Sequence, residues 1–440
     1  MDSAALIAAN RFGYGPAPGE LERIRGPRDY LRAQLAAGAE LPAYLAAQDS
    51  SKSIFIAMRA QRMQKKKGSG ERLVKNARDT YLRQAGARQR WAAESPQGLR
   101  ERLVHFWSNH FAVSIDKPQV LPLAFTMEQE AIRPNITGNF ADLLGAAIRH
   151  PAMLLYLDNT QSFGPRSRAG RRRKRGLNEN LAREILELHT LGVGGGYKQA
   201  DVRELAKAIT GWTVGSARFR PEKTGEFVFA EPVHEPGSVT VLARRYADSG
   251  EVQGSRILRD LALHPSTAKH LAHKLAVHFV DDNPPNEFVK QLAEVYLDSG
   301  GELLPLYHAL IDADEAWDAG GSKFRTPVEF VTASFRGLQI RQGRFLPSLR
   351  ALGQVPFKPG SPAGWPDNSA HWKTPAALLA RADWSDEVAD KQAFSIDLEQ
   401  WMDETMAGLF SDRTRLWVGR AETTAQGLAL ALMSPEFQQR

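Results

Sequence analysis

Two histidines and an asparagine lie among large aromatic residues in one short segment, residues 105–111. The segment reads His-Phe-Trp-Ser-Asn-His-Phe and ends an expected helix over residues 97–111. His105 and His110 are five residues apart, about 140° around a helix, so at most one of them is expected to face a given site. Because an imidazole titrates near neutral pH, His110 is a candidate catalytic residue and a candidate metal ligand. The alternative is a buried histidine that is hydrogen-bonded within an aromatic core.

Two carboxylates and an amide fall on one face of an expected helix in residues 178–192. They belong to Asn180, Glu184 and Glu187, and leucines lie beside them. Carboxylates that pack beside an apolar stripe have raised pKa values or need a cation. The pattern therefore predicts Glu184 and Glu187 as catalytic acid–base residues or, together with His110, as ligands of a divalent metal. We expect these three side chains to share one pocket.

A structural interpretation of the same helix stays open. Arg183 lies four residues from both Glu179 and Glu187, so the carboxylates can equally belong to a buried salt-bridge network. Helical periodicity turns His189 away from Glu184, and we do not expect these two residues to act together.

His234 occupies an expected turn with the sequence Val-His-Glu-Pro-Gly-Ser. A histidine in a turn above a helical body can close a site from the other side, so His234 is the fourth candidate catalytic residue. The alternative is a turn residue with no part in any chemistry.

Standard catalytic motifs are absent from this sequence. It has no P-loop, no G-x-S-x-G, no H-E-x-x-H and no G-x-G-x-x-G before a helix. Without a nucleotide or flavin motif, a hydrolase is the first reaction class to consider, and an oxidative metal enzyme is the second. The chain has no cysteine, so imidazole and carboxylate would hold any metal, which favours iron, manganese or zinc.

Positive charge is concentrated in two basic runs. The chain of 440 residues has a formal net charge of +7, and much of the excess lies at residues 65–67 and 166–175. The alternative to an enzyme is therefore a non-catalytic binding or assembly protein that presents these basic loops to an anionic partner. Nucleic acid is the least favoured partner, because no recognition motif accompanies the runs.

Apolar residues recur at helical spacing through most of the chain, and a hydrophobic content of 42% suffices for a large core. We predict an all-α, multi-helix globular body over residues 1–440 with one small β-hairpin near 225–246. A sub-boundary near 213–254 would separate helical halves at 1–212 and 255–440. The expected helices span residues 21–35, 53–91 with a break at the glycines, 97–111, 121–132, 140–148, 178–191, 200–212, 255–263, 266–279, 286–297, 303–311 and 327–338.

Two stretches predict irregular structure. Residues 160–176 are rich in Gly, Ser and Arg and predict a mobile loop, and residues 353–368 are rich in Gly and Pro. No stretch approaches the roughly 20 apolar residues that span a bilayer, and the first residues do not resemble a signal peptide. We therefore expect a cytoplasmic protein, with a periplasmic location as the alternative if the natural start lies upstream or a partner carries the chain out.

Several motifs of this chain occur in the order found in one bacterial family. They are Arg11-Phe12-Gly13-Tyr14-Gly15, the Phe106-to-Phe111 block, the helix at 178–192, Thr210-Gly211-Trp212 and Gly364-Trp365. Over nearly its whole length the chain resembles the uncharacterised family known as domain of unknown function 1800. The resemblance implies no settled activity. Similar sequences often carry a second histidine where this chain has Ser108, which disfavours a site that needs two imidazoles there.

Overall fold

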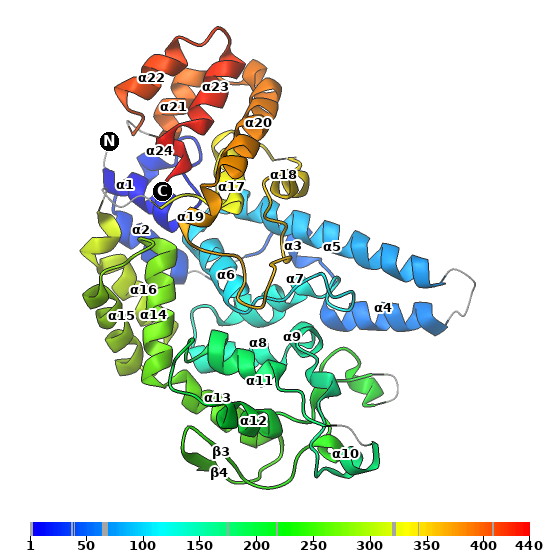
Figure 1. The fold of residues 1–440 in the computed structure, drawn as a ribbon. Coiled ribbons are helices and arrows are strands. Elements are labelled where there is room, and N and C mark those ends of the chain that lie inside the picture. The colour runs from blue at the N-terminus through cyan, green and yellow to red at the C-terminus, as the bar shows by residue number, and fades with distance from the viewer. Residues whose placement is uncertain are drawn as a thin grey trace.

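Helices form nearly all of the regular structure, as the periodicity predicts. The computed structural model describes residues 3–36, 38, 40–63, 69–173, 176–216, 219–318, 323–341, 343–406 and 409–440. In this part of the chain helices α1 to α24 are joined by short 3-10 and π-helical segments, and strands β1 to β4 are short (Figure 1). The predicted all-α fold class is confirmed. None of the described helices has the length and apolar character needed to cross a membrane.

The helices follow one another with short connections. Before the strands they are α1 (Ser3–Ile7), α2 (Pro27–Ala36), α3 (Ala43–Ala46), α4 (Ser51–Met63), α5 (Ser69–Glu94), α6 (Gly98–His110), α7 (Ala124–Met127), α8 (Phe140–Arg149), α9 (Pro151–Tyr156), α10 (Arg168–Arg173), α11 (Asn180–Glu184) and α12 (Gln199–Ala208). After the strands they are α13 (Glu251–Ala262), α14 (Pro265–Phe279), α15 (Asn286–Asp298), α16 (Leu303–Asp312), α17 (Pro327–Gly337), α18 (Phe345–Ala351), α19 (Ser369–Trp372), α20 (Pro375–Gln392), α21 (Leu398–Met406), α22 (Asp412–Gly419), α23 (Thr424–Met433) and α24 (Pro435–Gln438).

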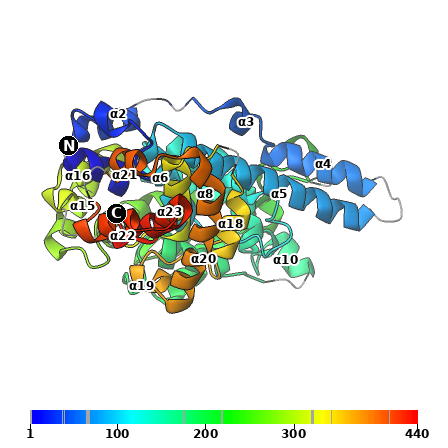
Figure 2. The same ribbon diagram turned by 90° about the horizontal axis from the view of Figure 1, so that it is seen from above.

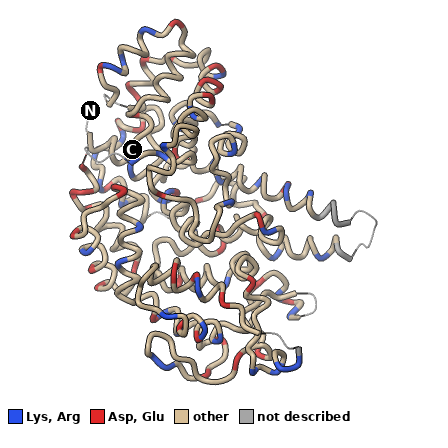
Figure 3. The backbone as a smooth tube through the Cα atoms, viewed as in Figure 1, with Lys and Arg blue, Asp and Glu red and all other residues tan. Residues whose placement is uncertain are grey.

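Helices α4 and α5 form an arm that projects from the body in both views (Figures 1 and 2). The sequence predicts two helices here, broken at glycines, and the structure confirms both. Lysine and arginine residues lie along both helices of the arm (Figure 3). The basic run at 65–67 itself lies outside the described residues.

Buried apolar side chains of the described residues form one main cluster, a smaller second one and a third, small cluster of N-terminal residues between Ala5 and Ile24. The main cluster runs from Ala8 to Ala316 and includes residues on both sides of the predicted sub-boundary, and Val239, Val241 and Tyr246 of the intervening segment belong to it. The second cluster consists of Ala93 and of residues between Phe330 and Phe437. Helix α17 and the C-terminal helices therefore pack around a core of their own.

Arg336 of α17 ties the second cluster to the N-terminal segment. Its guanidinium donates to both carboxylate oxygens of Glu20, at 2.9 and 2.7 Å, and to the carbonyl oxygens of Gly15, Ala93 and Ser95. Both charged side chains are buried. Because both groups are buried, each charge depends on the other: either one alone would be desolvated and unpaired.

The β-structure consists of two separate two-stranded ribbons, where the sequence predicts one hairpin. β1 (Trp212–Val214) pairs with β2 (Phe227–Phe229), and β3 (Val239–Val241) pairs with β4 (Arg244–Tyr246), both antiparallel. The 3-10 turn Glu231–Val233 separates the two alternating stretches. Leu242 and Ala243 close the second ribbon with positive φ angles of 48° and 61°, the conformation that two-residue hairpin turns require.

Residues 160–173 are folded, where the sequence predicts a loop without regular structure. They contain α10, and the backbone N–H and Nε of Arg166 donate to the carboxylate of Glu235 at 2.8 and 2.6 Å. The N–H of Gly164 donates to the carbonyl of Val233 at 2.9 Å. The prediction failed because the partners that order this segment lie about 70 residues away in the sequence. The basic run at 166–175 is described only to Arg173.

Replacing Arg336 with methionine should strongly destabilise the fold. The substitution leaves Glu20 buried without its cation, which typically costs about 3–5 kcal/mol. Urea unfolding followed by circular dichroism measures the loss. Lys391→Met is the matched control, because the Lys391–Glu387 pair is exposed (side chains 58% and 61% accessible) and should change the free energy of unfolding by less than about 0.5 kcal/mol. Equal losses in the two variants would contradict the assigned role of Arg336.

Candidate functional site

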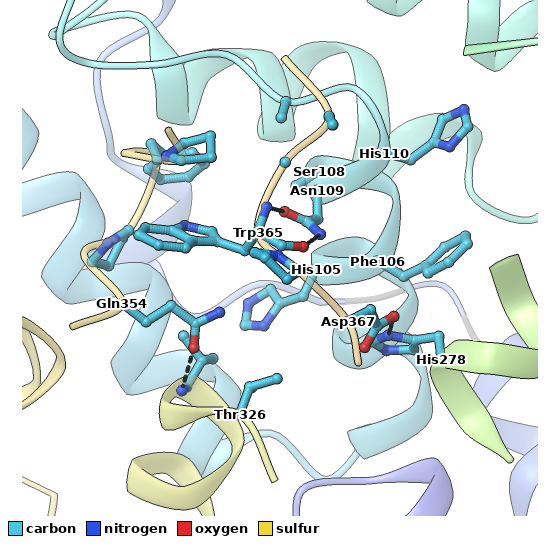
Figure 4. A pocket seen from close by; sticks show the side chains of 18 of the residues that line it. His105, Phe106, Ser108, Asn109, His110, His278, Thr326, Gln354, Trp365 and Asp367 are labelled. Carbon is cyan, nitrogen blue, oxygen red and sulfur yellow. Dashed lines mark hydrogen bonds and ion pairs between the residues drawn. The ribbon is translucent and has the colours of Figure 1, made fainter. Parts of the chain in front are cut away.

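A pocket of about 370 Å³ opens between α6, α14, the start of α17 and the irregular segment 354–367 (Figure 4). This volume suits a small molecule. Its wall carries an unusual number of ionisable side chains for its size: Tyr14, Arg88, His105, His110, Lys274, His278, Glu329 and Asp367. Clustered ionisable groups in a concave, largely apolar site mark a candidate active site.

The irregular segment that covers the pocket is fastened to α6 by Asn109. The side-chain amide of Asn109 donates to the carbonyl of Trp365 at 2.9 Å, and its oxygen accepts from the N–H of Trp365 at 2.7 Å. Gly364 has a φ of 86°, and a Cβ there would lie 2.4 Å from the backbone oxygen of Asn109. Only glycine therefore fits at this crossing. At the other end, Gln354 accepts from the N–H of Val328 at 2.8 Å.

His278 and Asp367 form a hydrogen-bonded pair on the wall. His278 Nδ1 lies 2.7 Å from Asp367 Oδ2, and Asp367 also pairs with Lys323 at 3.6 Å. Burial alone would raise the pKa of Asp367, but His278 and Lys323 lower it below its ordinary value, so the group is a carboxylate. Burial lowers the pKa of His278, although Asp367 acts in the opposite direction. A neutral His278 therefore donates from Nδ1 and leaves the lone pair on Nε2. This atom is buried and has no hydrogen-bond partner among the described residues.

His105 has the opposite arrangement. Its Nδ1 is in hydrogen-bond contact with the hydroxyl of Tyr14. Burial raises the pKa of Tyr14, so the phenol keeps its proton, and no acceptor other than His105 is in reach of it among the described residues. Burial, reinforced by Arg88 and Arg133, lowers the pKa of His105 well below its ordinary value. The neutral ring therefore accepts at Nδ1 and carries its proton on Nε2, which is also buried and unpartnered.

His105 and His278 both line the same pocket. Neutral His278 has the unprotonated Nε2 of a base, and neutral His105 has the Nε2–H of a donor. In the view of Figure 4, His105 lies between Trp365 and the Asp367–His278 pair. Nε2 of each ring is buried and has no hydrogen-bond partner among the described residues, although buried polar atoms normally have partners.

Buried ion pairs hold the surrounding helices in place. Glu329 pairs with Arg102 of α6 and with Arg440, whose Nη2 lies 3.0 Å away. Thr326 and Glu329 also form the capping box of α17, which follows from the sequence Thr-Pro-Val-Glu. Burial alone would raise the pKa of Glu329, but Arg102 and Arg440 lower it far below its ordinary value.

Ser108 faces the same pocket but is bound to an acid. Its hydroxyl donates to Glu128 at 2.9 Å, and Glu128 in turn accepts from Arg88 at 2.5 Å. Glu128 is therefore already neutralised, and Ser108 has no imidazole in hydrogen-bond contact among the described residues.

The predicted residue His110 lies on the pocket wall and contacts Lys274. Its Nε2 lies 3.2 Å from the carbonyl of His189, and its Nδ1 lies 3.1 Å from Nζ of Lys274. Nε2 therefore donates to the carbonyl, and Nδ1 accepts from the lysine. The expectation that at most one of His105 and His110 faces a site is wrong, because the pocket is wide enough for both to line it.

The structure does not bring Glu184 and Glu187 to this pocket. Neither carboxylate lines it or bonds to His110 in the described structure. Both are half-buried, and burial, followed by the charge of Glu187, raises the pKa of Glu184. Glu187 accepts from the hydroxyl of Tyr197 at 3.0 Å.

The helix continues from Glu184 as a π-helical segment over Ile185–His189, so regular α-helical spacing does not hold between Glu184 and Glu187. A π-helix adds a residue to the turn, which shifts the faces that α-helical spacing predicts. His189 is thereby fully buried against His110, and its Nδ1 lies 3.1 Å from the carbonyl of that residue.

His234 lies apart from the pocket, beside the first ribbon. It is buried, and its Nδ1 lies 2.9 Å from the carbonyl of Thr210. The neighbouring Glu235 N–H donates to the hydroxyl of Thr210 at 2.7 Å. The catalytic roles of His110, Glu184, Glu187 and His234 stay predictions. In the part of the chain that the structure describes, no group of three or more His, Asp or Glu side chains is arranged to hold a metal ion.

His278, Asp367 and Lys274 line the pocket but are not among the residues predicted from the sequence. Lys274 and His278 lie four residues apart on an apolar helix, a spacing that places both on one face. This signal was present in the sequence. Asp367 offered none, because it lies in an irregular segment whose path local patterns do not define.

The family described as Protein of unknown function (DUF1800) matches residues 7–439. The chain belongs to this family. No curated protein matches the chain, and no solved structure matches it. Membership in DUF1800 confirms the resemblance seen in the sequence, and its description assigns no activity. The pocket is therefore the feature of this chain that indicates a function.

Lys274 should make the stability of the protein depend on pH above neutrality. Burial lowers its pKa from 10.5 to about 8, with Asp367 acting in the opposite direction. Because the unfolded chain binds this proton more tightly, the charged lysine destabilises the fold fully below pH 8. The penalty disappears as pH rises from about 8 to 10.5. Urea unfolding should show Lys274→Met more stable than the native protein at pH 7, with a difference that shrinks toward pH 10. A difference independent of pH would contradict this.

Proposed function

We propose that the protein is a hydrolase that cleaves an ester or amide bond of a small molecule in the pocket between α6 and α14. His278, oriented by Asp367, is the general base, and His105, oriented by Tyr14, is the hydrogen-bond donor to the developing oxyanion. The observation that carries the proposal is a pair of imidazoles of opposite tautomer that line one pocket, each with a buried Nε2 that has no hydrogen-bond partner among the described residues. A base and an electrophilic donor in one small pocket are the groups that acyl transfer requires.

The reaction begins with a water molecule as the nucleophile. Nε2 of His278 takes one proton as the water oxygen bonds to the carbonyl carbon, and the carbonyl electron pair moves to oxygen. Asp367 stabilises the resulting imidazolium, and Nε2–H of His105 donates to the oxyanion. When the oxyanion collapses, the bond to the leaving group breaks, and His278 returns its proton to that group. No net proton remains on the protein.

His105 fits the donor role better than the role of an acid. A neutral imidazole that lost its Nε2 proton would become an imidazolate, which is far too basic to form at neutral pH. As a hydrogen-bond donor it keeps its proton throughout, and its lowered pKa keeps it neutral at pH 7. A neutral imidazole that polarises a carbonyl is a known catalytic device.

Water is favoured over Ser108 as the nucleophile. The Ser108 hydroxyl already donates to Oε2 of Glu128, and Arg88 donates to the same oxygen. An acyl-enzyme on Ser108 would need a base in contact with its oxygen.

Hydrolysis of umbelliferyl esters with neutral and with carboxylated acyl chains tests the proposal. For any ester cleaved, His278→Gln should lower kcat about 10²–10⁴-fold, the usual contribution of a general base. Asp367→Asn should also lower it, because the amide cannot hold the same tautomer of His278. His105→Phe should lower kcat through loss of the donor.

His273→Gln is the matched control for these variants. His273 lies on the same helix α14 as His278 but is exposed, and its substitution should leave kcat unchanged. A serine-directed fluorophosphonate should not label Ser108. Equal rates in the native protein and in His278→Gln, or labelling of Ser108 with loss of activity, would overturn the proposal.

A further inference from the structure

Lys274 is a largely buried cation without an ion-pair partner on the pocket wall. Its Nζ donates to Nδ1 of His110 at 3.1 Å. That ring is neutral, because burial and the charge of Lys274 lower its pKa well below the ordinary value. No carboxylate of the described residues lies within ion-pair distance of Nζ; Asp367 acts on it only from farther away. A buried ammonium without a counter-charge is costly, so the protein retains here a charge that its own side chains do not neutralise.

The other charges at the pocket are already paired. Arg88, the other Lys or Arg side chain on the described wall, is bound to Glu128 at 2.5 Å. Of the two carboxylates on the wall, Glu329 is neutralised by two arginines, and Asp367 by Lys323 and the hydrogen bond from His278. Because both carboxylates of the wall are paired with cations, they repel an incoming anion little. Lys274 is the cation on the described wall that can bind such an anion.

The other groups that face Lys274 are histidines in neutral form. The ring centroid of His110 lies 5.8 Å from that of His189 and 6.2 Å from that of His270, and both pairs of rings are tilted. Burial lowers the pKa of His189 to about 3 and that of His270 to about 4. These rings therefore neither neutralise the ammonium nor compete with it for an anion at physiological pH.

The spacing along α14 relates Lys274 to the reacting groups. Lys274 and His278 are four residues apart, so their side chains leave one face of the helix about 6 Å apart along its axis. An anionic group held at Lys274 would place a bond a few atoms away next to His278.

We propose that Lys274 binds an anionic group of the substrate, a carboxylate or a phosphate, about one helical turn from the bond that is cleaved. The identity of the bound anion as a substrate group rests on the proposed hydrolase. The binding of an anion at Lys274 does not, because it follows from the unpaired ammonium and its place in the pocket.

Nuclear magnetic resonance of the full chain labelled with ¹³Cε-lysine tests the site. The probes are acetate and inorganic phosphate, with acetamide as the neutral control, and the signal that disappears in Lys274→Met assigns Lys274. Acetate or phosphate should move this signal and raise the pKa of the lysine from about 8, because an anion stabilises the charged form. Acetamide should do neither. The response to acetate and to phosphate separately distinguishes a carboxylate from a phosphate site.

Affinities measured from the Cε1–H signals of the histidines provide the quantitative test. Lys274→Met should weaken anion binding about 10- to 100-fold, the usual range for a hydrogen bond to a charged group. Lys274→Arg keeps the positive charge and should retain part of the affinity. Its affinity shows whether the loss of binding in Lys274→Met comes from the lost charge or from misfolding. Lys269→Met is the matched control, since Lys269 is exposed on the same helix, and it should bind as the native protein does.

The outcomes separate this inference from the proposed hydrolase. Anion binding in a protein that hydrolyses no ester would support Lys274 and count against the hydrolase. Hydrolysis of neutral and carboxylated esters at equal kcat/KM, with no response of Lys274 to either anion, would overturn the role of Lys274 and leave the hydrolase intact. Equal responses to acetamide and acetate, or unchanged affinity in Lys274→Met, would also overturn it.

Discussion

Glu329 is a buried carboxylate that pairs with two arginines from distant parts of the chain, Arg102 of α6 and the last residue, Arg440. The same side chain caps α17 through the N–H of Thr326, which lies 2.8 Å from its Oε2. Because a buried charge is tolerated only with its partners in place, this ion cluster fixes α6 and α17 relative to each other. Arg440 also donates to the carbonyl of His278 at 2.6 Å, which brings the end of α14 into the same arrangement. The pocket lies where these three helices meet.

Burial then determines the chemistry of the pocket. The paired carboxylates keep their charge, while the imidazoles lose theirs, since burial disfavours the charged form. For His278 the effect of burial outweighs that of the Asp367 carboxylate. His105 and His278 are therefore neutral, and their tautomers are set by Tyr14 and Asp367. Lys274 is the exception among the cations on the wall, because it is left without a carboxylate. One set of packing contacts thus supplies a base, a donor and an unpaired cation within a single small volume.

Periodicity in the sequence predicts the helices of this protein well and the composition of the site poorly. The helices expected at 266–279, 286–297, 303–311 and 327–338 are found at Pro265–Phe279, Asn286–Asp298, Leu303–Asp312 and Pro327–Gly337. Apolar spacing decides such elements locally. The site depends on contacts between distant segments, such as Asn109 with Trp365 and His278 with Asp367, and on the π-helical turn that buries His189. No local pattern encodes these contacts. Helical spacing alone favours Glu184 and Glu187, and the local signal for His278, its four-residue separation from Lys274, does not indicate that Asp367 meets it.

The central claim is that His278 and His105 are neutral and carry their protons on opposite nitrogens. Long-range ¹H–¹⁵N spectra of histidine-labelled protein measure this directly at pH 7, because protonated and unprotonated ring nitrogens have distinct ¹⁵N shifts. The proton is expected on Nδ1 in His278 and on Nε2 in His105. A proton on Nε2 of His278, or a doubly protonated ring at either position, would contradict it, since the pocket would then contain no base next to a neutral donor.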